Sequence, residues 1–192
     1  TLDPMATGVL PVLLGRATAL SSLLLDADKR YTAKVKLGVT TDTEDITGNI
    51  ISENKVDVTN EQLNIALCAF RGKIMQKPPM YSAVKKNGVR LYKLAREGKT
   101  AEVEPREIEI FFIDLISPLD CDNVFEIDVH VSKGTYIRSL ARDIGEFLGC
   151  GACLTELKRT YTGGFSLEAC VPLDRLNKEN ISEYIISEEM AV

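Results

Sequence analysis

The sequence predicts an α/β (α+β) domain in which a mixed, mostly antiparallel sheet is flanked by helices. Apolar and polar side chains alternate over residues 31–37, which is typical of a half-buried strand. Two further β-rich runs, 107–116 and 123–132, are separated by a short polar stretch and so favour an antiparallel pair. Apolar residues then recur at helical spacing in 135–148.

Composition bounds the class of protein. The chain has 192 residues, 45% hydrophobic and 27% charged, which is enough for a sizeable core in one domain or a small pair. Its apolar runs are far shorter than a membrane span, so we expect no membrane partner. The five cysteines are odd in number and irregularly spaced, which favours reduced thiols in a cytoplasm over a disulfide framework.

The chain opens on a turn. Pro4 biases Asp3 away from helix and so places a carboxylate just before the apolar run at 9–14. Taken alone, an Asp-Pro pair more often starts a turn than serves in a site. Residues 18–27 have helical composition and are expected to have a buried face. Because the chain has no initiator Met and begins inside an apparent motif, we expect it to be a fragment with a segment missing upstream.

The strand at 31–37 is expected to end at Gly38, and a polar loop follows at 40–48. The acidic residues of this loop do not have EF-hand spacing, so we expect no metal site there. Residues 49–52 read as a short strand. They are followed by Thr59 and Gln62, which have the spacing of a capping box and predict a helix through residue 70.

A basic region lies between residues 77 and 99, although the whole chain has a net charge of −5. Its only acid is Glu97, and its bases are Lys77, Lys85, Lys86, Arg90, Lys93, Arg96 and Lys99. Asn87-Gly88 predicts a hairpin turn, and a short helix after it is expected to stop at Gly98. Tyr81 and Tyr92 could stack on unpaired nucleobases while the bases hold phosphates. A solvated surface loop is the alternative.

The helix predicted at 135–148 has Thr135 as its expected N-cap and Gly149 as its stop. Arg138 falls in the first turn, where the helix dipole slightly disfavours a cation. That position suggests an anionic partner, and an ordinary surface arginine is the alternative. A strand is predicted at 154–161, and the chain beyond residue 168 is acidic.

Two other motifs favour no chemistry. Cys150 and Cys153 have C-x-x-C spacing, but they lack a second pair for zinc and follow a helix where a redox motif would precede one. The lone His130 alternates with apolar residues on a predicted strand, without suitably spaced partners. We expect it to be a surface strand residue.

Four ordered blocks together resemble the TruB family of tRNA pseudouridine synthases. The likeness runs from Thr1 to about Asp174, and the blocks are Thr1-Leu-Asp-Pro-Met-Ala-Thr-Gly, Asp28-Lys-Arg-Tyr-Thr-Ala, Pro79-Met-Tyr-Ser-Ala-Val-Lys and Lys133-Gly-Thr-Tyr-Ile-Arg-Ser-Leu. The resemblance implies a pseudouridine-synthase-like sheet with a basic thumb-like insertion at 77–99. It also implies a catalytic domain over 1–174. The family often carries a C-terminal PUA domain, another RNA-binding module, but this chain ends in an acidic tail over 175–192, so we expect no PUA domain in it.

The resemblance implies isomerisation of uridine-55 in the tRNA T-loop to pseudouridine without a metal or cofactor. We also expect the protein to be a monomer. Asp3 matches the nucleophile, Tyr31 the aromatic that stacks on the flipped-out base, and Arg138 the cation paired with the carboxylate. The other matched residues bind substrate: Tyr136 and Leu157 in the uracil pocket, and Tyr81, Lys85, Lys86, Arg90 and Lys93 in the insertion that clasps the T-arm. A carboxylate nucleophile must be ionised, and a neighbouring guanidinium lowers an Asp pKa by about 1–3 units.

Two alternatives remain. One is a guide-dependent pseudouridylase related to dyskerin, against which the basic insertion argues, because a T-arm held by protein needs no guide. The other is a non-catalytic factor that binds or folds tRNA, since binding and catalysis share one cleft. In the family a Gly-His-Thr-Gly element precedes the first block, and its His helps to extrude the base. This chain does not contain that element, which leaves open whether the chain acts alone.

Overall fold

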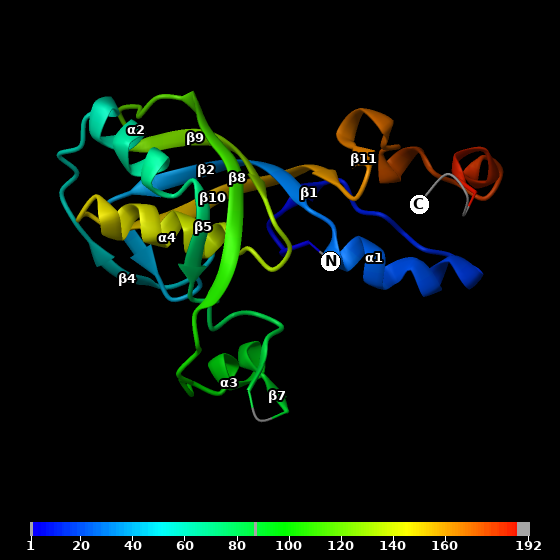
Figure 1. The fold of residues 1–192 in the computed structure, drawn as a ribbon, viewed down its shortest axis with the longest axis horizontal. Coiled ribbons are helices and arrows are strands. Elements are labelled where there is room, and N and C mark those ends of the chain that lie inside the picture. Colours follow the sequence, from blue (N-terminus) through cyan, green and yellow to red (C-terminus); the bar gives the residue numbers. More distant parts are fainter. Residues whose placement is uncertain (1, 87, 188–192) are drawn as a thin grey trace.

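The computed structural model describes residues 2–86 and 88–187, and a seven-stranded sheet organises them (Figure 1). The strand order is β1-β10-β2-β9-β8-β5, and β11 pairs with β10. Their bounds are β1 Thr7–Gly8, β2 Lys29–Leu37, β5 Gly72–Gln76, β8 Arg106–Ser117, β9 Val124–Val131, β10 Ala152–Thr162 and β11 Phe165–Ser166. The β1–β10 pairing is parallel and the others are antiparallel, which confirms the predicted mixed, mostly antiparallel sheet.

β2 lies in the middle of the sheet and shows the predicted alternation. Its residues Ala33, Val35 and Leu37 are buried, whereas the side chains between them face the other side. β9 and β10 flank β2, and β8 pairs with β9 as expected for the two β-rich runs. β5 was not predicted, because its short run of polar and apolar residues forms a strand only by pairing along β8.

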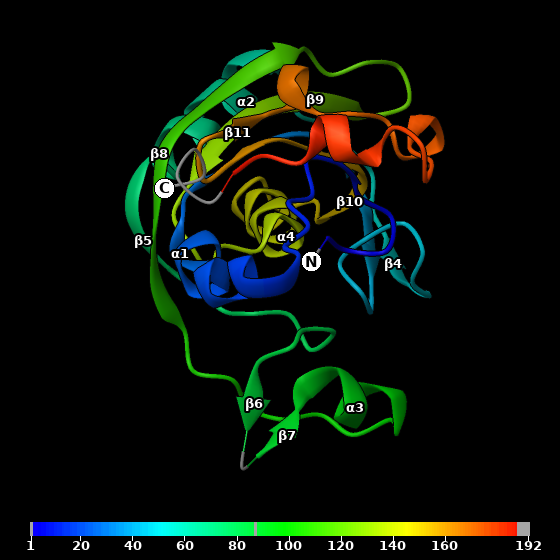
Figure 2. The same ribbon diagram turned by 90° about the vertical axis from the view of Figure 1, so that its right-hand side faces the viewer.

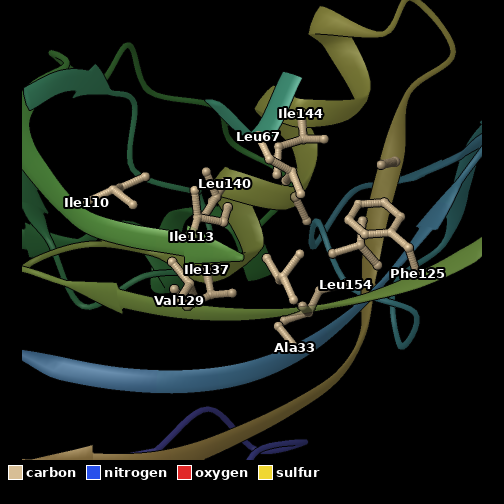
Figure 3. Close-up of a cluster of buried hydrophobic side chains, with 14 of the residues drawn as sticks. Ala33, Leu67, Ile110, Ile113, Phe125, Val129, Ile137, Leu140, Ile144 and Leu154 are labelled. Atoms are coloured by element: carbon tan, nitrogen blue, oxygen red, sulfur yellow. The ribbon is translucent and has the colours of Figure 1, made fainter. Parts of the chain in front are cut away.

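Helix α4, Ile137–Phe147, lies within the curve of the sheet (Figure 2). Its apolar stripe is buried at Ile137, Leu140 and Ile144, which meet side chains of several strands in the core (Figure 3). Gly145 permits a close approach to the sheet, since a Cβ there would lie 2.3 Å from the Ala152 nitrogen. Gly149 follows the helix with φ +75°, as its predicted stop requires.

The predicted N-cap of α4 was wrong by one residue. Tyr136 is the N-cap and contributes no side-chain bond. The hydroxyl of Thr135 instead donates to the carbonyl of Ser132, 2.9 Å away, and so braces the turn before the helix. A capping threonine and a turn threonine look alike in sequence because both bond to nearby backbone.

Helix α2, Asn60–Ala69, confirms the predicted capping box. The Thr59 hydroxyl accepts from the Gln62 amide, and the Gln62 side chain accepts from the Thr59 amide. Leu63, Ala66 and Leu67 are buried, so this helix adds a second helical layer to the core. Before it, β3 (Val39–Thr41) and β4 (Ile50–Glu53) form a separate two-stranded sheet around the polar loop.

The helical prediction for residues 18–27 was correct, but the expected buried face was wrong. The segment forms a 3-10 helix, Gly15–Leu20, followed by α1, Ser21–Asp26. Neither element contains a buried residue, and Leu23 and Leu25 are exposed. Composition therefore predicted the local helical conformation but not its burial.

The thumb-like insertion projects away from the sheet (Figures 1 and 2). It consists of β6 (Lys85–Lys86), β7 (Val89–Arg90) and α3 (Leu91–Arg96), and the two strands pair as an antiparallel hairpin. The predicted Asn87-Gly88 turn falls partly on Asn87, which lies outside the described residues. The predicted short helix and its stop at Gly98, with φ +69°, are confirmed.

Beyond β11 the chain carries three short 3-10 helices, Leu167–Ala169, Leu173–Arg175 and Ile181–Tyr184. The last five residues of the acidic tail, like Thr1 of the first motif block, lie outside the described residues. In residues 2–86 and 88–187, no helix has the length and apolar character needed to cross a membrane.

Candidate active site

A cavity of about 510 Å³ lies where the N-terminal turn, β2, β10 and the start of α4 meet. Four residues that are far apart in sequence line it: Asp3, Tyr31, Arg138 and Leu157. The predicted convergence of the three catalytic candidates in one cleft is therefore confirmed. Tyr136 and Tyr81 also line the cavity, whereas the predicted binding residues Lys85, Lys86, Arg90 and Lys93 lie on the thumb-like insertion outside it.

Asp3 and Arg138 form a two-point ion pair. Arg138 Nε donates to Asp3 Oδ2 at 2.8 Å, and Nη2 donates to Asp3 Oδ1 at 3.1 Å. The Asp3 turn closes through a bond from the Ala6 amide to the Asp3 carbonyl. The guanidinium is 5% exposed and the carboxylate 34% exposed, so the cation is fixed in the wall while the anion faces the cavity. Asp3 is thus the anionic partner that the position of Arg138 suggested.

The remaining donors of Arg138 bind backbone. Nη1 donates to the Thr43 carbonyl at 3.0 Å, and Nη2 donates to the Tyr81 carbonyl at 3.1 Å. The Asp45 carboxylate is 3.8 Å from Nε and adds a second negative charge. Because these partners come from three separate segments, the orientation of the guanidinium is determined on every side. Asp45 was noticed in the sequence only as a loop acid, and nothing local distinguished it from its neighbours.

Tyr31 enters the cavity from the first core-facing position of β2. It lies opposite Arg159 of β10 in the strand register. Burial raises the pKa of Tyr31, the charge and hydrogen bond of Arg159 oppose that rise, and the charge of Asp3 adds to it. The phenol is therefore protonated at neutral pH.

Arg159 was missed in the sequence. It is buried, and its Nε donates to the Val9 carbonyl at 2.8 Å, which ties β10 to the N-terminal segment. The sequence could have indicated Arg159, because it follows the cavity residue Leu157 by two positions and therefore lies on the same face of the strand.

Gln76 is a second residue that sequence reasoning missed. Its carboxamide is buried and binds both backbone groups of Tyr136. The Tyr136 amide donates to Oε1 at 2.8 Å, and Nε2 donates to the Tyr136 carbonyl at 3.1 Å. Gln76 ends β5 immediately before the basic region, so it joins the base of the insertion to the residue that begins α4.

The thumb-like insertion carries exposed cations and also reaches the cavity. Tyr92 and Arg96 of α3 line the cavity wall, and the Arg96 guanidinium lies 5.4 Å from the centre of the Tyr92 ring. Lys85, Arg90 and Lys93 are exposed. A strand of nucleic acid that entered the cavity would therefore meet positive charge on this unit.

Metal-binding residues do not gather in the part of the chain that the structure describes. No group of three or more His, Cys, Asp or Glu there could hold an ion. Cys150 and Cys153 are free, buried thiols at the start of β10. His130 is half-buried on β9, pairs with Asp28 and packs against Phe111, and it does not line the cavity.

Two protein-family models match the chain. "TruB family pseudouridylate synthase (N terminal domain)" covers residues 1–137, and "tRNA pseudouridylate synthase B C-terminal domain" covers 138–190. The curated proteins called tRNA pseudouridine synthase B from Francisella philomiragia and from Francisella tularensis subsp. novicida are each 51% identical over 189 residues. These matches cover 97% of this chain and 62% of each relative, so the chain spans less than two thirds of their length.

Solved structures with the same fold include chains of two larger assemblies. A chain of a Cbf5–Nop10–Gar1 complex superposes with a TM-score of 0.70 at 31% identity, over 95% of this chain and 47% of that one. A chain of an H/ACA RNP bound to a substrate RNA containing 2'-deoxyuridine gives 0.66 at 28% identity, over 97% and 45%.

Proposed function

This chain belongs to the TruB family of pseudouridine synthases, and from that premise we propose that it isomerises uridine-55 in the T-loop of tRNA to pseudouridine. The observation that carries the proposal is the two-point ion pair between Asp3 and Arg138 in a cavity that Tyr31 also lines. An ionised carboxylate that keeps an open face is the group that a nucleophilic mechanism requires. The cavity volume of about 510 Å³ lies in the usual range for small-ligand sites, so a single flipped-out nucleotide can enter.

The reaction exchanges one glycosidic bond for another within the same nucleotide. The bond from C1' to N1 breaks, the base turns, and a bond from C1' to C5 forms. C5 then releases its proton and N1 gains one, so no electron donor or cofactor is needed. Asp3 supplies the carboxylate that bonds transiently to the detached base or to the sugar and is released again once the C1'–C5 bond has formed, and Arg138 aims that carboxylate through two hydrogen bonds.

The other cavity residues bind the extruded base. Taking a nucleotide out of its stack costs a few kcal/mol, and an aromatic or apolar contact recovers part of that free energy. Tyr31 offers a ring and a protonated hydroxyl, and Leu157 offers an apolar wall. Lys85, Lys86, Arg90 and Lys93 hold the phosphates of the T-arm from the thumb-like insertion, and Tyr81 and Tyr136 complete the pocket.

We propose that residues 1–174 work as one catalytic unit and that 175–192 form an acidic tail. The two family models divide the chain at 137/138, which is the first turn of α4. The sheet runs across that division, since β10 from the second part pairs with β2 from the first. Strand pairing of this extent supports a single folding unit.

A guide-dependent activity is the second candidate, favoured by the likeness to chains of the two Cbf5-type assemblies. The fold does not distinguish the guide-dependent activity from direct action on tRNA, because both types of enzyme would share the sheet and the cavity. The 51% identity to curated proteins called tRNA pseudouridine synthase B supports direct action on tRNA. The exposed bases of the insertion support it too.

The test is release of tritium from C5-labelled uridine in tRNA, without guide RNA, by the full-length protein that contains this chain. Replacing Asp3 by Asn should lower the rate by more than about a thousandfold, the scale expected when a nucleophile is removed. Binding of tRNA should persist. The control is Asp114→Asn, which removes a carboxylate that pairs with Arg71 on the sheet, and it should release tritium normally.

Equal release by the Asp3 variant and its parent would contradict the nucleophile assignment. A parent that binds tRNA but releases tritium only after guide RNA is added would support the guided activity. Binding without release in either case would support a folding factor. A transcript with cytidine at position 55 should release nothing if uridine-55 is the target.

A further inference from the structure

Two arginines one turn apart on α4, Arg138 and Arg142, bind the same two segments of the chain, the loop after β3 and the segment after β5. Arg138 donates to the carbonyls of Thr43 and Tyr81. Arg142 pairs with the carboxylate of Glu44 through Nη1 and donates to the carbonyl of Lys77 through Nη2, at 3.2 Å. Both side chains therefore span from the polar loop after β3 to the segment that leads into the thumb-like insertion. Only Arg138 reaches the cavity.

Glu44 is held against α4 at both carboxylate oxygens. Oε1 accepts from Arg142, and Oε2 accepts from the Ser139 hydroxyl at 2.7 Å. Its side chain is 14% exposed, and that of Arg142 is 21% exposed. Glu44 also has φ +64°, a left-handed conformation that a residue with a Cβ adopts only when its surroundings impose it. These contacts account for a charged residue in a buried, strained place on the loop.

The neighbours of Glu44 bear directly on the candidate active site. Thr43, before it, presents its carbonyl to Arg138. Asp45, after it, places Oδ2 3.8 Å from Arg138 Nε, and its other oxygen accepts from the Thr43 hydroxyl at 2.9 Å and the Thr47 amide at 3.0 Å. Glu44 itself does not line the cavity, and its contacts with α4 fix the backbone that carries both partners of Arg138.

We infer that Glu44 and Arg142 form a positioning pair for the reaction. The pair clamps the loop at 41–47 and the base of the thumb-like insertion onto α4, so that the Arg138 fork stays aligned on Asp3. Neither residue lines the cavity, so any effect on the reacting base would pass through Arg138 and its partners. The effect on catalysis rests on the proposed function, whereas the effect on Arg138 does not.

The kinetic test uses the full-length protein with Glu44→Gln, Arg142→Met and both changes together. Small misalignment of a reacting group lowers rates steeply, so we expect the single-turnover rate to fall about tenfold in each single variant. The KM for tRNA should change less than twofold. The double variant should be no slower than Arg142→Met, because that change already removes the Glu44–Arg142 pair together with the Arg142 contacts to the Lys77 carbonyl and to Asp143.

Arg142→Lys tests whether one of the two contacts of Arg142, with Glu44 or with the Lys77 carbonyl, is enough to support the reaction. A lysine can pair with Glu44 or reach the Lys77 carbonyl, but its single ammonium cannot do both as the guanidinium does. We expect it to restore part of the lost rate. The matched control is Asp128→Asn, which breaks a two-point pair with Arg30 on the opposite face of β2 from Tyr31 and should leave the rate unchanged.

A second readout does not need activity. The Arg138 Nε proton, which bonds to Asp3, should exchange with solvent about tenfold faster in Glu44→Gln than in the parent, as followed by NMR of the arginine side chains. Unchanged exchange together with an unchanged rate would overturn the inference, and so would a rate loss matched by Asp128→Asn or explained by unfolded protein. An inactive parent would instead contradict the proposed function, and the exchange measurement would still decide the positioning role.

Discussion

At the scale of single residues, Asp3 and Tyr31 meet different surroundings in one cavity. Asp3 keeps an exposed face and pairs with a buried guanidinium, so it can act as an anion that faces substrate. Tyr31 lies mostly in the wall, where burial raises its pKa against the opposing effect of Arg159. A phenol with a raised pKa is a poor base at neutral pH, but it can stack on a nucleobase and donate a hydrogen bond.

The raised pKa of Tyr31 predicts a late ionisation in alkaline solution. Because the unfolded chain releases this proton near the ordinary tyrosine pKa of 10.0 and the folded chain releases it at higher pH, folding stability should fall as pH rises from that value to the folded pKa. Ultraviolet difference titration of the parent minus Tyr31→Phe should show a tyrosine that ionises above pH 10. Tyr92→Phe is the control, because the hydrogen bond from Arg90 lowers the pKa of Tyr92. If the tyrosine ionisation that disappears in Tyr31→Phe has its midpoint at or below pH 10, this assignment is wrong.

At the scale of the element, α4 carries the site. Its apolar stripe was readable in the sequence, and its first turn delivers Arg138 to Asp3 while the next turn delivers Arg142 to Glu44. The helix sits close to β10 because position 145 is a glycine. The distance between α4 and the sheet therefore determines where both arginines lie relative to their partners, Asp3 and Glu44.

Because of this close approach, Gly145→Ala should destabilise the protein, whereas helix propensity alone would predict that it stabilises it. At an open helical position the change should stabilise by about 1 kcal/mol. Here the new Cβ would lie 2.3 Å from backbone atoms of Gly151 and Ala152, so we expect the free energy of unfolding to fall by about 1–3 kcal/mol. Chemical denaturation measures this, with the exposed α2 substitution Asn64→Ala as the propensity control. A gain in stability for Gly145→Ala would show that α4 can move off the sheet freely.

At the scale of the whole molecule, charge is divided between the parts. The chain has a net charge of −5, yet the thumb-like insertion concentrates exposed bases and projects from the sheet beside the cavity. Such a division lets one protein attract a phosphate backbone at one place while most of its surface repels it. The insertion is also connected to the Asp3–Arg138 ion pair, because the Tyr81 carbonyl accepts a hydrogen bond from Arg138.

The charge division predicts that Lys85→Ala and Lys93→Ala weaken tRNA binding without slowing the chemical step. Each lost phosphate contact should reduce the slope of log affinity against log salt by about 1 and raise KM, while kcat stays near that of the parent. The control is Lys73→Ala on β5, which removes a lysine that pairs with Glu107 at 3.1 Å. A salt slope that does not change in either insertion variant would place the tRNA elsewhere.

The sequence by itself determined the main strands, the capping box of α2 and the stripe of α4, and its resemblance to a known family pointed to Asp3, Tyr31 and Arg138, which line one cavity. Those features depend on local spacing or on contiguous motifs. Only the tertiary structure decided that Arg159 and Gln76 support the site, that Glu44 pairs with Arg142, and that Leu23 and Leu25 are exposed. Spacing along a chain encodes backbone conformation and which side of an element is apolar. It does not encode which distant segment lies against that side, because the order of strands in the sheet settles that through long-range pairing.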